Sequence, residues 1–278
     1  MSKKVKKRIA FCIALFTIIM LYWWGFSLKC EEYEISSDKI SSTVRLVFIS
    51  DLHNCFYGGT DQSEIIDIIE EIQPDAVLFG GDVIDQYGGT KYSLKLMKSA
   101  SEKYPCYYTH GNHEEMRDDI DSFYAEVDKL NIHRLEGQGA ELTVNGQKIK
   151  VYGVSDAYMQ GKKKTQLQDC LDDLDNSCYN ILLAHSPEQY TEYFDSSNKV
   201  QFDLVLSGHA HGGQWRLPGI LEQGVYSPDQ GIFPDYTNGQ FSYGDSVHIV
   251  SRGLARPLRM ILIPRIFNRP EFSVISIN

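Results

Sequence analysis

The stretch "VRLVFISDLHNCFYGGTDQSEIIDIIEEIQPDAVLFGGDVI" (residues 44–84) decides the fold. Its apolar run over residues 44–53 predicts a strand, and residues 61–73 carry apolar side chains at helical spacing until Pro74 stops the pattern. A second apolar run over residues 76–84 predicts another strand. This order is typical of a βαβ unit, in which the two strands run parallel in one sheet.

The rest of the chain extends this pattern. Residues 92–104 predict a helix, residues 106–113 predict a third strand, and a helical stretch follows near residues 118–130. A hairpin is predicted to turn at Asn145–Gly146. Further strands are predicted at residues 180–186, 202–209, 246–252 and 272–277. Because no repeat or low-complexity linker divides residues 43–278, we predict one α/β domain with two packed sheets.

Charge is distributed unevenly along the chain, whose formal net charge is −10. Five basic residues fall within the first eight positions, so the remaining chain is more acidic than this total. Proteins that bind long nucleic acids cluster lysine and arginine, and the acidic body therefore argues against such a partner. The six cysteines show no C-x-x-C spacing. Cys170 and Cys178 could pair, but their spacing alone does not decide this.

The uncharged segment over residues 9–28 indicates a membrane anchor. As a helix it would rise about 30 Å, the thickness of the hydrocarbon core of a bilayer. Aromatic residues at positions 22–24 lie near its far end, where membrane interfaces favour them. A cleaved secretion signal is the alternative, but the segment is long and no small-x-small site ends it. We predict a basic cytoplasmic tail (1–8), a single transmembrane helix, a linker (29–42) and an extracytoplasmic domain.

Polar side chains follow the predicted strands at the point where each strand ends. The first three strands end in Asp51-Leu-His53, in Gly81-Asp82 and in Gly111-Asn112-His113-Glu114, and later strands lead to His185, His209 and His211. The carboxyl ends of parallel strands meet at one edge of a sheet, which is where α/β folds bind ligands. We therefore expect these side chains to converge.

The chemistry of these side chains indicates divalent cations. Carboxylate, imidazole and amide oxygen without thiolate suit Mn, Fe or Zn. The set is too large for one tetrahedral zinc site, so two ions with shared ligands fit better. Asp82, which follows two glycines, is the natural candidate for a carboxylate that bridges both ions.

These motifs resemble the calcineurin-like metallophosphoesterases, whose pattern is D-x-H, G-D, G-N-H-[DE], an isolated H and G-H-x-H. All five blocks occur here in that order, and the resemblance covers about residues 45–278. The stretches "GIFPDYTNGQF" and "VSRGLARP" further resemble a bacterial, membrane-anchored branch of phosphodiesterases. The resemblance implies a four-layer α/β/β/α metallophosphoesterase sandwich.

The resemblance also implies a role for each matching residue. The first ion would be held by Asp51, His53, Asp82 and His211, and the second by Asp82, Asn112, His185 and His209. His113 would bind no metal; it would stabilise the transition state and protonate the leaving alkoxide. The implied enzyme is a membrane-anchored phosphodiesterase that attacks a phosphate ester with a metal-bridging hydroxide.

Other functions remain open. A pyrophosphohydrolase of nucleotide-linked lipids would use nearly the same chemistry, and a phosphomonoesterase is less favoured. A non-enzymatic metal-dependent binding module is also open, although binding alone does not call for His113. The substrate is expected to be a phosphate ester, with lipid-linked esters among the candidates, and the sequence leaves the oligomeric state open.

The sequence also predicts roles for residues outside the set of candidate ligands. Glu114 is expected to support the site rather than to bind metal, and His110, His133 and His248 are expected to be structural. An arginine-rich segment over residues 252–269 has two interpretations. Its arginines could face anionic lipid, or they could pair with the surplus carboxylates while Met260–Ile263 packs inward; the second is favoured.

Overall fold

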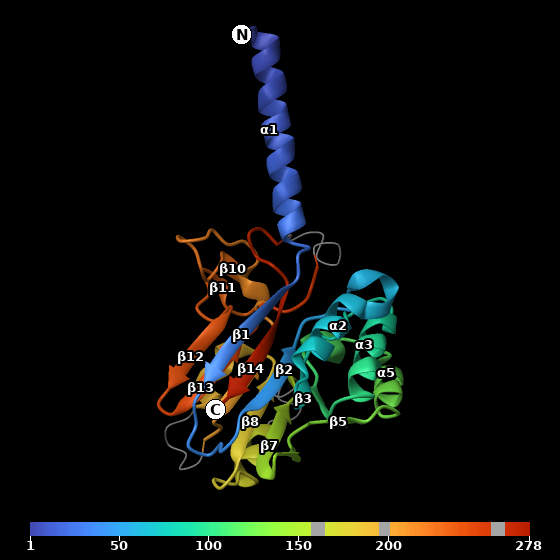
Figure 1. Ribbon diagram of the computed structural model, residues 1–278, viewed down its shortest axis with the longest axis vertical. Coiled ribbons are helices and arrows are strands. Elements are labelled where there is room, and N and C mark those ends of the chain that lie inside the picture. The colour runs from blue at the N-terminus through green and yellow to red at the C-terminus, as the bar shows by residue number, and fades with distance from the viewer. Residues whose placement is uncertain (157–164, 195–200, 257–264) are drawn as a thin grey trace.

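The apolar runs of the sequence form strands that are buried on both faces. In the computed structural model, which describes residues 1–156, 165–194, 201–256 and 265–278, these strands build two six-stranded sheets (Figure 1). In spatial order the first sheet contains β1 (Lys29–Ile35), β14 (Glu271–Ile277), β2 (Val44–Ile49), β3 (Ala76–Gly80), β4 (Cys106–Thr109) and β5 (Ile132–Arg134). The second contains β12 (Gly239–Tyr243), β13 (Ser246–Val250), β9 (Leu204–Ser207), β8 (Tyr179–Ala184), β7 (Gln147–Val154) and β6 (Gly139–Val144).

Helices cover the outer faces of both sheets. The first sheet is covered by α2 (Ser63–Ile72), α3 (Lys91–Ser101) and α5 (Ile120–Val127), and the second by α6 (Gln166–Asp172) and α7 (Tyr190–Tyr193). Short elements lie in the loops: η1 (Gly58–Gln62), α4 (Asn112–Glu115), η3 (Pro187–Gln189), η4 (His211–Gly213), β10 (Tyr226–Ser227) and β11 (Gly231–Ile232). The predicted α/β fold with two packed sheets is confirmed.

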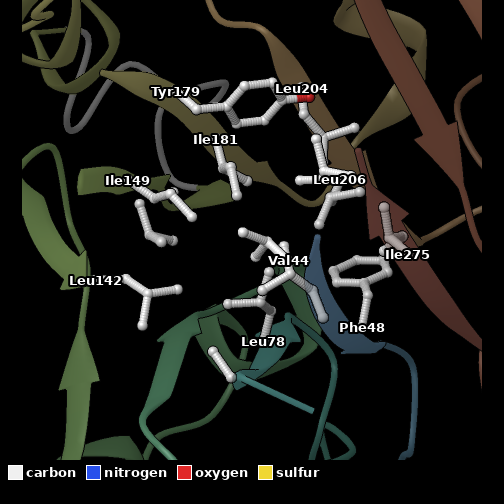
Figure 2. Packing of buried hydrophobic residues seen from close by; sticks show 14 of the residues in the cluster. Val44, Phe48, Leu78, Leu142, Ile149, Tyr179, Ile181, Leu204, Leu206 and Ile275 are labelled. Carbon is white, nitrogen blue, oxygen red and sulfur yellow. The ribbon is translucent and has the colours of Figure 1, made fainter. Parts of the chain in front are cut away.

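The central core lies between the two sheets. Figure 2 shows Val44, Phe48 and Leu78 of the first sheet opposite Ile181 and Leu206 of the second. All five are fully buried. Burying one such side chain contributes about 1.5–3 kcal/mol, so this layer holds the strand ends of both sheets in fixed positions.

The strand directions bring the loops of interest to one end of the molecule. The strands β2, β3 and β4 pair in parallel, as the sequence predicted, and β5, which was not among the predicted strands, pairs in parallel with β4. In contrast, β14 runs antiparallel to β2 and parallel to β1. Lys29 at the start of β1 pairs with Glu271, and Ser273 pairs with Phe48 near the end of β2. The carboxyl ends of β2, β3 and β4 therefore lie at the end of the body where β1 begins.

The segment predicted to be an anchor is helical, but the structure does not support its crossing a membrane. The helix α1 (Lys3–Trp24) projects away from the body (Figure 1). It contains the basic residues and ends at Trp24. Among the described residues, no helix is both long and apolar enough to span a membrane.

Two further sequence predictions change. The linker predicted at residues 29–42 is wrong in its first half, because Lys29–Ile35 forms the strand β1. Its glutamates are compatible with this strand, because an edge strand tolerates charged side chains. The question of a disulfide is also answered in this structure: Cys170 and Cys178 are both buried free thiols.

Candidate metal centre

Loops from both sheets converge at the end of the body where β1 begins. Asp51 follows β2, Asp82 follows β3, and Asn112 begins α4 directly after β4. His185 follows β8, while His209 and His211 follow β9. The packing of the two sheets thus brings together residues that are far apart in the sequence.

The predicted ligands form two adjacent groups. Atoms of Asp51, His53 and His211 lie within 4.8 Å of one another, and so do atoms of Asp82, His185 and His209. The amide oxygen of Asn112 lies 3.0 Å from Nδ1 of His209, which places it beside the second group.

Asp82 lies between the two groups. Its Oδ2 is 3.7 Å from Nε2 of His53 in the first group and 3.2 Å from Nε2 of His185 in the second. Its Oδ1 accepts a hydrogen bond of 2.9 Å from the backbone N–H of His113. The backbone therefore fixes one oxygen of this carboxylate, and the other faces both groups.

Asp51 is held in the same way. Its Oδ1 accepts a hydrogen bond of 2.9 Å from the backbone N–H of His209, whereas its Oδ2 is buried without a hydrogen-bond partner. Nε2 of His53 is likewise buried and has no hydrogen-bond partner. Leaving a buried polar atom unsatisfied costs about 1–3 kcal/mol, and a bound cation would remove that cost. The donor set and these two atoms fit a site for divalent cations.

The backbone at this site is strained. Asp51, His53, Asp82, His209 and His211 all have positive φ angles, between 47° and 66°. Residues other than glycine rarely adopt this left-handed conformation, and each instance costs on the order of 1–3 kcal/mol. Strain gathered on these residues indicates a site that the surrounding fold holds in place for function.

The histidines differ in their protonation. Burial lowers the pKa of His53 to about 4, so its ring is neutral and can offer a lone pair to a cation. Burial also lowers the pKa of His185, but the nearby carboxylates, led by Asp82, outweigh it and raise that pKa well above its ordinary value. Nδ1 of His185 lies 2.8 Å from the carbonyl oxygen of Gly80, which orients the ring so that Nε2 faces Asp82.

Glu114 supports the site, as the sequence predicted. Its carboxylate is fully buried and accepts backbone N–H hydrogen bonds from Gly111, Asp82 and Ile84 at 2.9, 2.8 and 3.2 Å. Burial and the neighbouring Asp82 raise the pKa of Glu114 to about 8. The side chain joins the loop after β3 to the loop after β4, and so fixes the position of Asp82.

Three further histidines, His110, His133 and His248, make contacts outside the two groups. His110 is buried and its Nε2 lies 2.9 Å from Glu115. His133 stacks on Tyr107 with ring centroids 5.1 Å apart, and the buried His248 lies 2.9 Å from the hydroxyl of Ser207. Each contact matches the structural role expected for these residues.

Three carboxylates beside the site were missed in the sequence, and one of them, Glu188, lies with His209 and Asp229 in a further group of possible ligand atoms within 4.8 Å of one another. Oδ1 of Asp85 lies 3.1 Å from Nδ1 of His113, and Oδ2 of Asp229 lies 3.0 Å from Nε2 of His209. Asp85 could have been found, because it follows Asp82 closely in the same glycine-led turn. Asp229 lies in a loop without any pattern, and no sequence signal marks it.

The arginine-rich segment pairs largely with the protein itself. Arg252 lies 3.2 Å from Glu271, and Arg256 lies 3.1 Å from Glu64. Arg265 is buried and donates to the carbonyl groups of residues 252 and 253. The contacts of Arg252 and Arg256 fit the favoured pairing with carboxylates, whereas Arg265 binds backbone carbonyl groups instead. Arg259 and the Met260–Ile263 stretch lie outside the described residues.

A methyl group at Gly81 is expected to weaken cation binding. Gly81 has a φ of +91°, and a Cβ there would lie 2.6 Å from Nδ1 of His185. Gly81→Ala should therefore displace the His185 ring or the backbone of Gly111, which the Cβ would approach to 2.8 Å. Either shift should lower metal affinity about 10–100-fold, the loss typical of residues that orient ligands. Isothermal titration with Mn²⁺ or Zn²⁺ measures this.

The control is Gly146→Ala in the hairpin turn. Gly146 has a φ of +81°, but a Cβ there meets nothing within 4 Å. This variant carries the same backbone cost without the clash and should keep its metal affinity. Equal affinities of the two variants would contradict the placement of His185.

Comparison with known proteins identifies relatives of the chain. The family model of the calcineurin-like phosphoesterases matches residues 44–213. The chain is 30% identical over 198 residues to a putative metallophosphoesterase of Caenorhabditis elegans, an alignment that covers 68% of this chain and 40% of that protein. It is 30% identical over 205 residues to an uncharacterized metallophosphoesterase of Helicobacter pylori (strain ATCC 700392 / 26695), covering 69% and 52%.

A third relative aligns over a longer stretch of the chain. The chain is 24% identical over 243 residues to a Danio rerio protein named transmembrane protein with metallophosphoesterase domain, covering 81% of this chain and 55% of that protein. The chain spans about half the length of these curated relatives.

Proposed function

The chain belongs to the calcineurin-like phosphoesterase family, and from this premise we propose that it is a metal-dependent phosphodiesterase with two divalent cations. The observation that carries the proposal is the shared position of Asp82 between two groups of ligand atoms. A carboxylate that faces both groups suits a pair of ions about 3.5–4 Å apart, the arrangement that hydrolyses phosphate esters.

In this proposal the predicted ligands keep the roles implied by the sequence. One cation would be held by Asp51, His53, Asp82 and His211, and the other by Asp82, Asn112, His185 and His209. Mn, Fe or Zn suits these oxygen and nitrogen ligands. When bound, the cations supply Lewis acidity toward the phosphate ester and toward the attacking water.

His113 is the proposed proton donor to the leaving group. Its Nε2 lies 3.9 Å from Oδ2 of Asp82, and its Nδ1 faces Asp85. Burial lowers the pKa of His113, but Asp82 and Asp85 outweigh burial and raise it to about 9. Before cations bind, the ring therefore carries a proton at neutral pH, and its side chain remains 30% exposed, so a substrate can reach it.

Asp85→Asn is expected to shift the pH profile of the reaction. An acid catalyst must be protonated, so activity is lost as the pH rises through the pKa of His113. The Asp85 carboxylate helps to raise that pKa, and its replacement should move the alkaline limb of kcat/KM about one pH unit lower.

The control for this variant is Asp67→Asn. Asp67 is exposed on α2, so the substitution removes one negative charge away from His113. Its alkaline limb should match that of the unaltered chain. An unchanged limb in Asp85→Asn would argue against the pairing of His113 with Asp85.

The proposed function is tested by metal analysis joined to a substrate panel. The full chain should retain about two equivalents of Mn, Fe or Zn and should hydrolyse phosphodiesters faster than monoesters. Preference for a nucleotide-linked lipid pyrophosphate would identify the alternative enzyme. Bound metal without turnover of any ester would favour a binding module and refute the proposal.

We also propose that α1 attaches the protein to a membrane. Its apolar side chains are exposed along the helix, with Phe11 at 68%, Phe16 at 64% and Ile18 at 63%. Exposed apolar surface of this extent is typical of contact with lipid or protein. The Danio rerio relative is named as a transmembrane protein, which supports attachment here. The chain should co-sediment with phospholipid vesicles, and Phe11→Ser with Phe16→Ser should release it.

A further inference from the structure

Beyond α1, the exposed large apolar side chains gather at one end of the body. Among the residues that the structure describes, they all lie in loops at the end that carries the candidate metal centre. They are Phe56, Tyr87, Met116, Trp215, Leu217, Ile220, Tyr226, Ile232 and Phe233. Single exposed apolar residues are normally scattered over a protein, so their restriction to one end calls for a cause.

Each of these side chains lies close in sequence to a residue of the metal centre. Phe56 shortly follows His53, Met116 shortly follows His113, and Trp215 shortly follows His211. Ile232 belongs to β11, whose loop also carries Asp229, the partner of His209. The apolar side chains therefore lie in the loops that also carry residues of the metal centre.

The opposite end of the body differs. There, among the described residues, the hairpin turn at Asn145–Gly146 and the turn at the end of α3 expose polar side chains, such as Glu102 at 61%. Ile220 and Ile232, by contrast, are 73% and 71% exposed. A need for solubility alone would not leave large apolar side chains exposed at one end of the body and polar side chains at the other.

The helix α1 emerges from the same end. Figure 1 shows α1 leaving the body at the end where β10 and β11 are drawn. The ring of Trp24, at the end of α1, packs edge-on against Phe267 with centroids 5.9 Å apart. Arg256 donates to the carbonyl oxygens of Phe26, just after α1, and of Phe56, in the loop after β2. The apolar side chains of the loops thus continue the exposed apolar surface of α1.

We propose that an apolar rim, defined as Phe56, Trp215, Leu217, Ile220, Ile232 and Phe233, docks on the surface of a lipid bilayer, so that the metal centre opens toward phosphodiesters carried by lipids. Because the rim continues the exposed apolar surface of α1, we take its binding partner to be a bilayer rather than a second copy of the chain. Tryptophan, phenylalanine and isoleucine are side chains that enter the boundary between headgroups and acyl chains. The substrate class, though not the docking, rests on the proposed phosphodiesterase function.

Fluorescence quenching by brominated lipid tests the docking directly. The chain has three tryptophans, so Trp23→Phe with Trp24→Phe leaves Trp215 as the reporter. This full-length variant is reconstituted in phosphatidylcholine vesicles whose acyl chains carry bromine. A side chain buried about 5–10 Å into the interface should lose about half of its emission or more.

The matched control moves the reporter to the far end of the body. Trp215→Phe and Glu102→Trp are added to the same background, and this reporter should keep its emission. Quenching of Trp215 that is no stronger than at position 102 would overturn the proposal. The proposal would also be overturned if self-association covered the rim. This outcome would be seen as a dimer that Phe233→Ser disrupts while the quenching by lipid does not change.

The substrate class is tested separately. Ile232→Ser with Phe233→Ser should lower the ratio of turnover on a vesicle-borne phosphodiester to turnover on a soluble aryl phosphodiester about tenfold, because docking presents the lipid headgroup. An unchanged ratio would overturn a lipid substrate. If the unaltered chain hydrolyses no phosphodiester, the proposed function fails, whereas the quenching experiment still decides the docking.

Discussion

Replacing His113 with alanine should lower the hydrolysis of a phosphodiester with a poor leaving group about 10²–10⁴-fold. The departing alkoxide needs a proton, and the proton on His113 is held beside Asp82 and Asp85. His113 contributes its backbone N–H, not its ring, to the position of Asp82, and alanine keeps that N–H. Metal content should therefore persist while turnover falls, as measured by metal analysis and steady-state kinetics on the same sample.

The leaving group provides an internal test of this role. A nitrophenyl ester departs without much help from an acid, so its hydrolysis by His113→Ala should fall much less than that of an alkyl ester. His133→Ala is the matched control, because this exposed histidine stacks on Tyr107 away from the metal centre. Equal losses on both esters would show that His113 acts other than as an acid.

The sequence predicted the central strands because burial on both faces leaves a clear mark. In β2, β3 and β4 nearly every residue is buried, so each strand is a continuous apolar run with a definite end. The strand β1 carries no such mark. It lies at the edge of its sheet, pairs on one side with β14, and its glutamates remain at least partly exposed.

The candidate ligands were predictable for a related reason. Asp51, Asp82 and Asn112 each stand where an apolar run stops, and parallel strands bring such ends together. Asp229 shows the limit of this reasoning. It reaches His209 from the β10–β11 turn, whose path depends on tertiary contacts, such as the hydrogen bond from the backbone N–H of Val225 to the carbonyl oxygen of Gly213.

The predicted anchor shows that the composition of a segment does not give the bounds of its helix. Residues 9–28 lack charge, but the length of a helix is set by where its backbone hydrogen bonds begin and end. The helix starts at Lys3 and stops at Trp24, so its boundaries do not coincide with those of the uncharged segment. A count of apolar residues does not contain this information.

Asp82→Ala should abolish binding of both cations and lower turnover by about 10³-fold or more, since a shared ligand serves both sides of the centre. Its Oδ2 faces His53 in one group and His185 in the other, so alanine removes a negative ligand from each. The raised pKa of His185 depends on the nearby carboxylates, with Asp82 the strongest, and should fall in this variant. Metal stoichiometry after dialysis measures the loss directly.

Asp51→Ala distinguishes a shared ligand from an ordinary one. Asp51 belongs to the group with His53 and His211, and the group of Asp82, His185 and His209 does not include it. This variant should therefore keep about one equivalent of metal, whereas Asp82→Ala keeps none. Asp67→Ala on the exposed face of α2 should keep both equivalents and controls for the loss of one carboxylate. If Asp82→Ala and Asp51→Ala retain the same amount of metal, Asp82 does not bridge the two groups, and the centre must be built from two independent ligand sets.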